Sequence, residues 1–228
     1  MSLNIVEKID DHIKINHVLI SVSDKSGLER FASRLVEINP KVRIFSTGGT
    51  FKRLKEIMGD DAENRLIRVS EYTGQPETQG GLVKTLDFKI YLGLLTETYN
   101  ERHQEDLKRT AAVPIDMVVA NLYPFQEVVA KKETRLEEAR GNIDIGGPCM
   151  IRAAAKNFIR VASVVSPDSY DAIIKEMEAG CGGIALASRF QLAQKAFRHT
   201  ASYDAAIADF LESQTEDAMR AGYTFQGV

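Results

Sequence analysis

The sequence has little of several residue types on which metal sites and disulfide scaffolds depend. It contains no tryptophan, four histidines and two cysteines, Cys149 and Cys181, in 228 residues. Two isolated cysteines without a CxxC pair argue against a disulfide framework or a zinc site, and they fit a reducing cytoplasm. The histidines lack metal-ligand spacing, so no bound metal is expected. Any chemistry should therefore rest mainly on Lys, Asp, Tyr and backbone groups.

Long apolar runs and a strong charge of one sign are also missing. No stretch approaches the roughly 20 apolar residues that a membrane span needs, and the first residues lack an apolar signal core. With 29 Lys and Arg against 32 Asp and Glu, the net charge is −3, which favours neither nucleic acid nor an anionic membrane as partner. A globular protein is expected, because hydrophobic residues make up 44% and charged residues 27%. A cytoplasmic location is expected from the missing signal core and the two isolated cysteines.

Short β-branched runs alternate with helical patterns along the chain. Alternation of this kind predicts an α/β fold, a three-layer α/β/α sandwich with a mostly parallel sheet of about five strands. From residue 184 the pattern is helical to about Ser213, which predicts a C-terminal helical extension. No composition break divides the chain, so residues 1–228 are expected to form a single domain. The five predicted strands are His17–Ser23, Val42–Ser46, Arg65–Ser70, Ile115–Tyr123 and Val161–Ser166.

Polar loops follow several of these strands, at the edge of a parallel sheet where ligands bind. SVSDKSG places Ser23 and Lys25 after the first strand, and STGGT places residues 47–50 after the second. Adjacent glycines can present N–H groups near a helix N-terminus, and a lysine adds charge, so the two loops together predict a phosphate site. Each loop alone is equally consistent with a plain strand-to-helix turn.

The segment NIDIGGPCMIRAAAKN is the most informative. Asp144 precedes two glycines, and Pro148 suits the first turn of a helix. Asp144 is read either as a simple helix cap or as a functional carboxylate. The N–H groups of Ile145 and Gly146 should then point to one spot. Lys156 lies about three turns along an apolar helix, so its ammonium is expected to be buried, with a lowered pKa.

Seven motifs occur together in a fixed order, and together they resemble one enzyme family. The chain is similar, from about His17 to Leu211, to the inosine monophosphate (IMP) cyclohydrolase domain of the bifunctional purine-biosynthesis enzyme, which implies a methylglyoxal-synthase-like fold. The formyltransferase domain of that enzyme is absent here. The motifs are SVSDKSG, STGGT, SEYTGQPE, GGLVKTL, ANLYPF, IDIGGPCMIRAAAKN and KAFRHTASYDAAI.

The resemblance assigns roles to residues whose positions match the family motifs. Its catalytic group falls on Lys84, Tyr123, Asp144 and Lys156. It implies that Lys84 and the N–H groups near Ile145 and Gly146 stabilise the formyl oxygen, while Lys156, Asp144 and Tyr123 move protons. Its substrate-binding positions fall on Ser23, Lys25, Thr47, Gly48, Gly49, Thr50, Thr85 and Asn121, together with Ile145 and Gly146.

The sequence departs from the family pattern in one segment. Leu82 stands where the family usually has Arg, and Asp87 and Phe88 stand where it usually has His-Pro. The loss of a guanidinium removes a fixed cation with five donors, and Asp87 is expected to add negative charge nearby. Lys89 is a candidate to supply the missing contact. The departures leave the four catalytic positions intact.

The expected activity is ring closure of 5-formamidoimidazole-4-carboxamide ribonucleotide to IMP and water. The step is neither a redox reaction nor a phosphoryl transfer, so no cofactor is expected. A non-catalytic nucleotide-binding regulatory module of the same fold is the alternative, and NLYPF, VKTL and AAAKN argue against a methylglyoxal synthase. The expected partners are a purine ribonucleotide, with a homodimer and a separate formyltransferase as further candidates.

Overall fold

The computed structural model describes residues 5–76, 78, 83–131 and 133–226. Its centre is a five-stranded, fully parallel sheet in the order β4-β3-β2-β5-β6. All five strands lie where the β-branched runs predict them, so the α/β sandwich with about five strands is confirmed. The strands are β2 (His17–Val22), β3 (Arg43–Ser46), β4 (Leu66–Arg68), β5 (Met117–Asn121) and β6 (Ala162–Val164).

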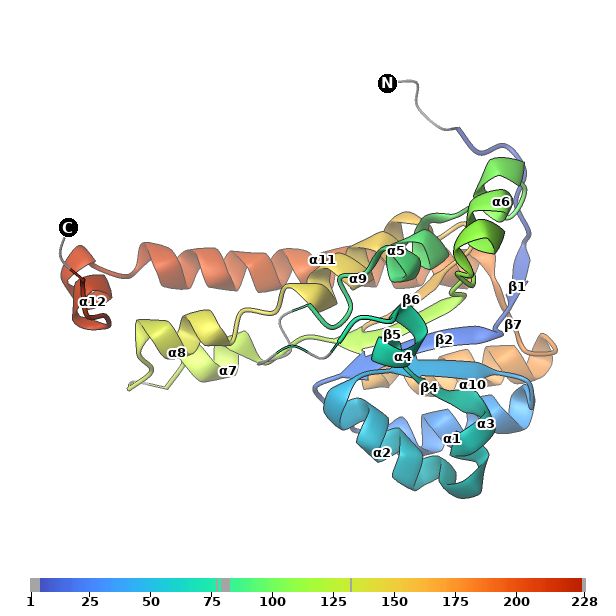
Figure 1. The fold of residues 1–228 in the computed structure, drawn as a ribbon, viewed down its shortest axis with the longest axis horizontal. Coiled ribbons are helices and arrows are strands. Elements are labelled where there is room, and N and C mark those ends of the chain that lie inside the picture. The colour runs from blue at the N-terminus through green and yellow to red at the C-terminus, as the bar shows by residue number, and fades with distance from the viewer. Residues whose placement is uncertain (1–4, 77, 79–82, 132, 227–228) are drawn as a thin grey trace.

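Helices cover both faces of this sheet and give the three layers (Figure 1). One core packs under α1 (Leu28–Ile38), α2 (Gly48–Met58) and α10 (Tyr170–Ala179). The other core packs under α5 (Phe88–Leu95), α9 (Gly146–Lys156) and α11 (Leu186–Glu212). Strands β2, β5 and β6 therefore bury side chains on both faces, which explains their mainly apolar sequences.

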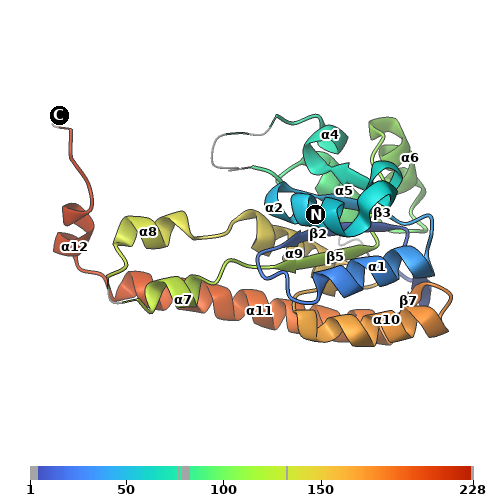
Figure 2. The ribbon, with the colours of Figure 1, turned by 90° about the horizontal axis from the view of Figure 1, so that it is seen from below.

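The remaining helices are short or peripheral. They are α3 (Ala62–Arg65), α4 (Val69–Thr73), α6 (Glu101–Thr110), α7 (Phe125–Val129), α8 (Leu136–Gly141) and α12 (Glu216–Ala221), with 3-10 turns at Gly59–Asp61 and Pro167–Ser169. The predicted helical extension is one 27-residue helix, α11, followed by α12. Its distal half projects beyond the sheet beside α7 and α8 (Figure 2). None of the helices in the described ranges is long and apolar enough to cross a bilayer.

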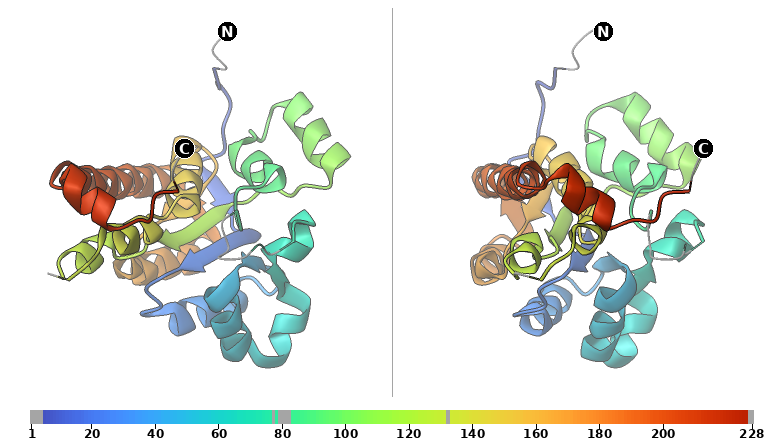
Figure 3. Two further views of the ribbon diagram at one scale, coloured as in Figure 1. Left: turned by 60° about the vertical axis from the view of Figure 1, so that its left-hand side comes forward. Right: turned by 90° about the vertical axis from the view of Figure 1, so that its left-hand side faces the viewer.

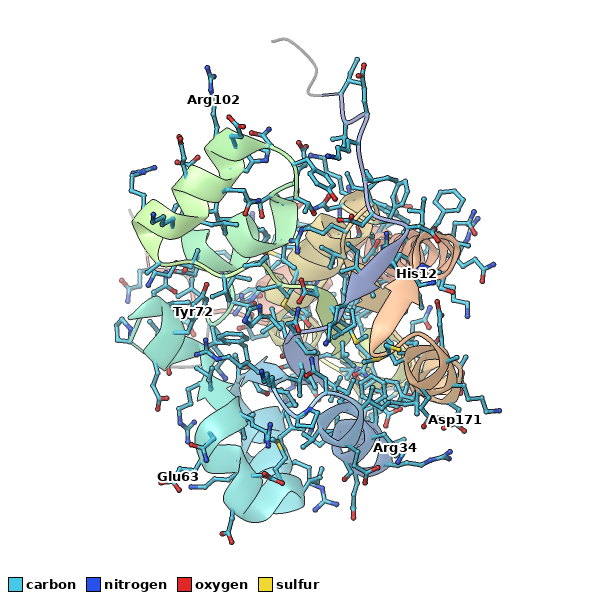
Figure 4. The ribbon with its side chains drawn as sticks, turned by 90° about the vertical axis from the view of Figure 1, so that its right-hand side faces the viewer. His12, Arg34, Glu63, Tyr72, Arg102 and Asp171 are labelled. Carbon is cyan, nitrogen blue, oxygen red and sulfur yellow. The ribbon has the colours of Figure 1, made fainter. Side chains whose placement is uncertain are left out.

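A second sheet was not predicted from the sequence. Strand β1 (His12–Lys14) pairs antiparallel with β7 (Gly183–Ala185). Figure 4 looks at this end of the molecule, with His12 on β1 and with Arg34 of α1 and Asp171 of α10 at the outer surface. Each strand has only three residues, too few for an alternating pattern to stand out.

The order of the strands determines where a ligand can bind. From β2 the chain moves outward through β3 to β4, and later through β5 to β6 on the other side of β2. The views in Figure 3 show β2 at the middle of the sheet, between the two layers of helices. In open parallel sheets the crevice forms where the order reverses, outside the carboxyl ends of the strands. Here that point lies between β2 and β5.

Candidate active site

A cleft of about 450 Å³ opens at this point, at the carboxyl ends of β2, β3 and β5. Its lining contains thirteen of the fourteen residues that the sequence assigns to the site. They are Ser23, Lys25, Thr47, Gly48, Gly49, Thr50, Lys84, Thr85, Asn121, Tyr123, Asp144, Ile145 and Gly146. Segments up to about 120 residues apart in sequence thus meet in one hollow.

Lys156 is the exception, and its expected burial is wrong. It is exposed and does not line the cleft. Helix α9 begins at the cleft with Gly146, and at 1.5 Å per residue its ten steps carry Lys156 about 15 Å away. The apolar face of the helix, including Ala153, Ala154 and Ala155, packs in the core, whereas Lys156 lies off that face.

The cation-rich side of the cleft lies over the N-terminus of α2. Thr47 has extended backbone and precedes the helix, whose first N–H groups have no partners within it. The ammonium of Lys84 lies 3.5 Å from the position a Cβ on Gly48 would take. The ammonium of Lys25 is held near the end of β2 by the carbonyls of Val22 and Ser23, at 3.4 and 3.3 Å. Two cations and a helix dipole together favour a phosphate group here.

Two residues expected to bind substrate use their polar atoms within the fold. The Thr50 hydroxyl accepts from Val22 N at 3.1 Å and donates to Val22 O at 3.0 Å. The Asn121 carboxamide oxygen accepts from Ser23 N and Asp24 N at 2.7 and 2.8 Å, and its nitrogen donates to Asp24 O at 2.9 Å. Both side chains shape the cleft by fixing the end of β2.

The other side of the cleft is built around Asp144. Its Oδ1 accepts from Gly147 N at 2.9 Å, so the carboxylate does cap the start of α9. Its second oxygen accepts no hydrogen bond from any residue that the structure describes. Burial raises the pKa of this carboxyl, although the Gly147 hydrogen bond lowers it. Tyr123, 53% exposed, lines the same cleft. A partly buried carboxyl with one free oxygen is suited to proton transfer.

The start of α9 leaves no room for side chains at its two glycines. A Cβ on Gly146 would lie 2.7 Å from the Thr85 hydroxyl. A Cβ on Gly147 would lie 2.4 Å from Asp144 Oδ2 and 2.7 Å from Leu122 Cδ2. Ile145 and Gly146 line the cleft at the start of α9, where the first N–H groups of a helix have no acceptor within it.

Gly147→Ala is expected to lower the free energy of unfolding by about 1–3 kcal/mol, the cost of overpacking a tight site. The added methyl must displace both the Asp144 carboxylate and the Leu122 side chain. Urea denaturation measures the effect, and Gly141→Ala is the matched control, because its Cβ would meet nothing within 4 Å. Equal stability of the two variants would contradict the steric argument.

The departing segment lies only partly within the described residues. Leu82 falls outside them. Asp87 is 9% exposed and accepts from Lys89 N at 2.7 Å as the N-cap of α5. It is not among the residues that line the cleft, although its neighbour Leu86 is. The Lys89 ammonium donates to Tyr72 O at 3.1 Å, and Lys89 does not line the cleft. It is therefore not placed to replace the arginine that the family usually has at position 82. Phe88 is 60% exposed. Asp87 and Phe88 thus begin helix α5, and neither lines the cleft.

Among the described residues, no group of three or more His, Cys, Asp or Glu side chains is placed to hold a metal ion. One residue that sequence reasoning missed is Tyr203, whose hydroxyl accepts from Asp144 N at 2.8 Å. Its helical spacing marks it as a core position of α11. Its partner is 59 residues away, and periodicity carries no signal for such a contact.

Comparisons with known proteins agree with the motifs. Residues 27–149 match the MGS-like domain, and residues 154–227 match the AICARFT/IMPCHase bienzyme. The bifunctional purine biosynthesis protein PurH of Acidithiobacillus ferrooxidans is 46% identical over 207 residues, which are 91% of this chain and 38% of the relative. PurH of a Thermoanaerobacter species is 49% identical over 195 residues, 85% of this chain and 36% of the relative. The chain thus spans less than two-fifths of these relatives.

A solved structure resembles the chain over nearly its own full length. The crystal structure of ForH superposes with a TM-score of 0.72 at 32% sequence identity. The match covers 86% of this chain and 99% of the ForH chain.

Proposed function

The chain belongs to the AICARFT/IMPCHase bienzyme family and carries its MGS-like domain, and from this premise we propose that it is an IMP cyclohydrolase. It closes the six-membered ring of 5-formamidoimidazole-4-carboxamide ribonucleotide to give IMP and water. The observation that carries the proposal is the single cleft that contains thirteen of the fourteen residues matched to the family motifs.

The reaction forms one C–N bond and loses one water. The carboxamide nitrogen attacks the formyl carbon, and its proton moves to the formyl oxygen. The resulting hydroxyl then leaves with the proton of the formamide nitrogen. The carboxamide is a weak nucleophile, so the two groups must be held together, the oxygen must be stabilised and the protons must be moved.

The proposed roles follow from the two sides of the cleft. Lys25 and the start of α2 hold the 5′-phosphate, because they provide a cation and free N–H groups. The N–H groups of Ile145 and Gly146, with Lys84, stabilise the developing negative oxygen. Asp144, whose pKa is raised by burial, and Tyr123 move the protons. A role for Lys156 in proton transfer is proposed only because its position matches a lysine of the family motif.

The substrate needs a formyl group on its amine, so a formyltransferase must act before this chain. We propose that this formyltransferase activity lies outside residues 1–228. We further propose that residues 1–228 form one domain and act in the cytosol. A homodimer is a further candidate partner within the proposal.

Ring closure by the purified chain, followed by absorbance, tests the proposal. The expected result is formation of IMP that depends on enzyme concentration. Calorimetry with IMP provides the second arm. Tight binding of IMP without ring closure would contradict the proposed activity and support the regulatory module.

Lys25→Ala is expected to weaken IMP binding by about 1.5–3 kcal/mol, the range for a hydrogen bond to a charged group. Calorimetry measures the change. Lys52→Ala is the matched control, because Lys52 is an exposed lysine of α2 outside the cleft. Equal affinities of the two variants for IMP would show that Lys25 does not bind the phosphate.

A further inference from the structure

Tyr203 connects helix α11 to the loop that carries Asp144. Its hydroxyl accepts from Asp144 N at 2.8 Å and donates to Asn142 O at 3.3 Å. The side chain is 8% exposed, and its phenolic oxygen thus has both a donor and an acceptor on one short stretch of backbone. One side chain from a long helix therefore fixes two residues of the loop just before α9.

The ring of Tyr203 also contacts the loop that follows Tyr123. Phe125, the first residue of α7, packs edge-on against it with the ring centroids 6.2 Å apart. Phe125 is 1% exposed and contacts Phe210 of α11 in the same manner, at 5.8 Å. The two loops that supply the proton-handling groups therefore rest on the same helix.

The surroundings of Tyr203 suit a fixed, neutral hydroxyl. Burial is the main cause of the raised pKa of its phenol, and the nearby Asp144, Asp204 and Tyr123 raise it further. A neutral phenol can accept one hydrogen bond and donate another at the same time. An ionised one would lose the donor to Asn142 O.

We propose that Tyr203 is a positioning residue for ring closure, which holds the Asp144 carboxylate in place through the backbone of residues 142–144. The proposal rests on the proposed function, since it assigns Tyr203 no contact with substrate. Asp144 Oδ1 caps α9, and the two hydrogen bonds of the Tyr203 hydroxyl fix the preceding loop from the α11 side. Small displacements of a catalytic group reduce the rate strongly.

The test is Tyr203→Phe, which keeps the ring and its packing and removes only the hydroxyl. We expect kcat to fall by about tenfold and KM to change by less than about twofold, because the lost bond affects placement of Asp144 and leaves the phosphate side intact. In an Asp144→Asn background, Tyr203→Phe should cause almost no further loss, because two groups that act through one step are not additive. In a Lys25→Ala background, the tenfold loss should persist in full.

Tyr72→Phe is the matched control. The Tyr72 hydroxyl accepts from Val113 N at 2.8 Å, so it is the same kind of bond at a half-buried site. Tyr72 lies on α4, visible in Figure 4, and does not line the cleft. We expect the control to keep kcat within about twofold of the unmodified chain, even where the two variants lose similar thermal stability.

Amide hydrogen exchange provides a readout that does not depend on activity. The Asp144 amide should be protected in the unmodified chain and should exchange at least about tenfold faster in Tyr203→Phe, since it loses the one acceptor that the described residues give it. Unchanged exchange, an unchanged kcat, or a full additional loss on top of Asp144→Asn would each overturn the positioning role. If the unmodified chain closes no ring, the proposed function is contradicted instead. The exchange measurement then still shows whether Tyr203 fixes the loop that carries Asp144.

Discussion

Asp144→Asn is expected to lower kcat for ring closure by about 10²–10³-fold, within the range for loss of a general acid or base. The substitution keeps the shape of the side chain and its ability to cap α9, because Asn is as good a cap as Asp. It removes the ionisable oxygen that faces the cleft. The affinity for IMP should stay within about tenfold, since the phosphate side is untouched.

The chain offers a matched control for this substitution. Asp87 caps α5 by accepting from Lys89 N at 2.7 Å, as Asp144 caps α9 by accepting from Gly147 N at 2.9 Å. Asp87→Asn therefore changes the same kind of cap outside the cleft and should leave kcat within about twofold. Steady-state kinetics on both variants decide the assignment, and near-normal kcat in Asp144→Asn would remove Asp144 from the chemistry. The kcat of Lys156→Ala, measured in parallel, shows whether Lys156 contributes to ring closure as the resemblance implies.

Arg189→Met is expected to lower the free energy of unfolding by about 3–5 kcal/mol, the range for breaking a buried charged network. Arg189 is 0% exposed, and its guanidinium donates to five backbone carbonyls. The acceptors belong to three separate segments: Asp10 and Asp11, Phe158 and Ile159, and Ile184. Methionine fills similar space but removes the guanidinium donors from those carbonyls, of which Asp11 O still accepts from Leu186 N at 2.7 Å.

Urea denaturation of Arg189→Met and of Arg198→Met separates this effect from a general effect of losing a charge. Arg198 is an exposed residue of the same helix, so its substitution should change the free energy of unfolding by less than about 0.5 kcal/mol. Arg189→Lys should recover only part of the loss, because an ammonium offers three donors in place of five. A loss below about 1 kcal/mol in Arg189→Met would contradict the role of the guanidinium.

The central sheet was predictable because its strands are buried on both faces. Within the run Ile115–Tyr123 the four residues 117–120 are all apolar, and no helix of ordinary length fits between the flanking polar loops. The strands β1 and β7 were not predictable. The conformation of His12–Lys14 depends on pairing with residues some 170 positions later and on Arg189, and neither leaves a local pattern.

The position of the cleft was also predictable, whereas the roles of individual polar atoms were not. Polar loops after parallel strands must meet at one edge, and Ser23, Thr47 and Tyr123 do so. Whether a polar atom is free depends on partners from elsewhere in the chain. The side chains of Thr50 and Asn121 bond to β2 and its following loop, and the sequence spacing carries no trace of those bonds.

The pairing of β1 with β7 has a consequence for the order in which the chain folds during synthesis. His12–Lys14 can pair only after Gly183–Ala185 has been made, and Arg189 must follow before its guanidinium can reach the carbonyls of Asp10 and Asp11. At about 5–20 residues per second, the ribosome needs on the order of ten seconds or more to cover that distance. Throughout that interval β1 waits without its partner strand, so residues 12–14 are exposed to proteases for longer than the parts of the chain that pair with nearer neighbours.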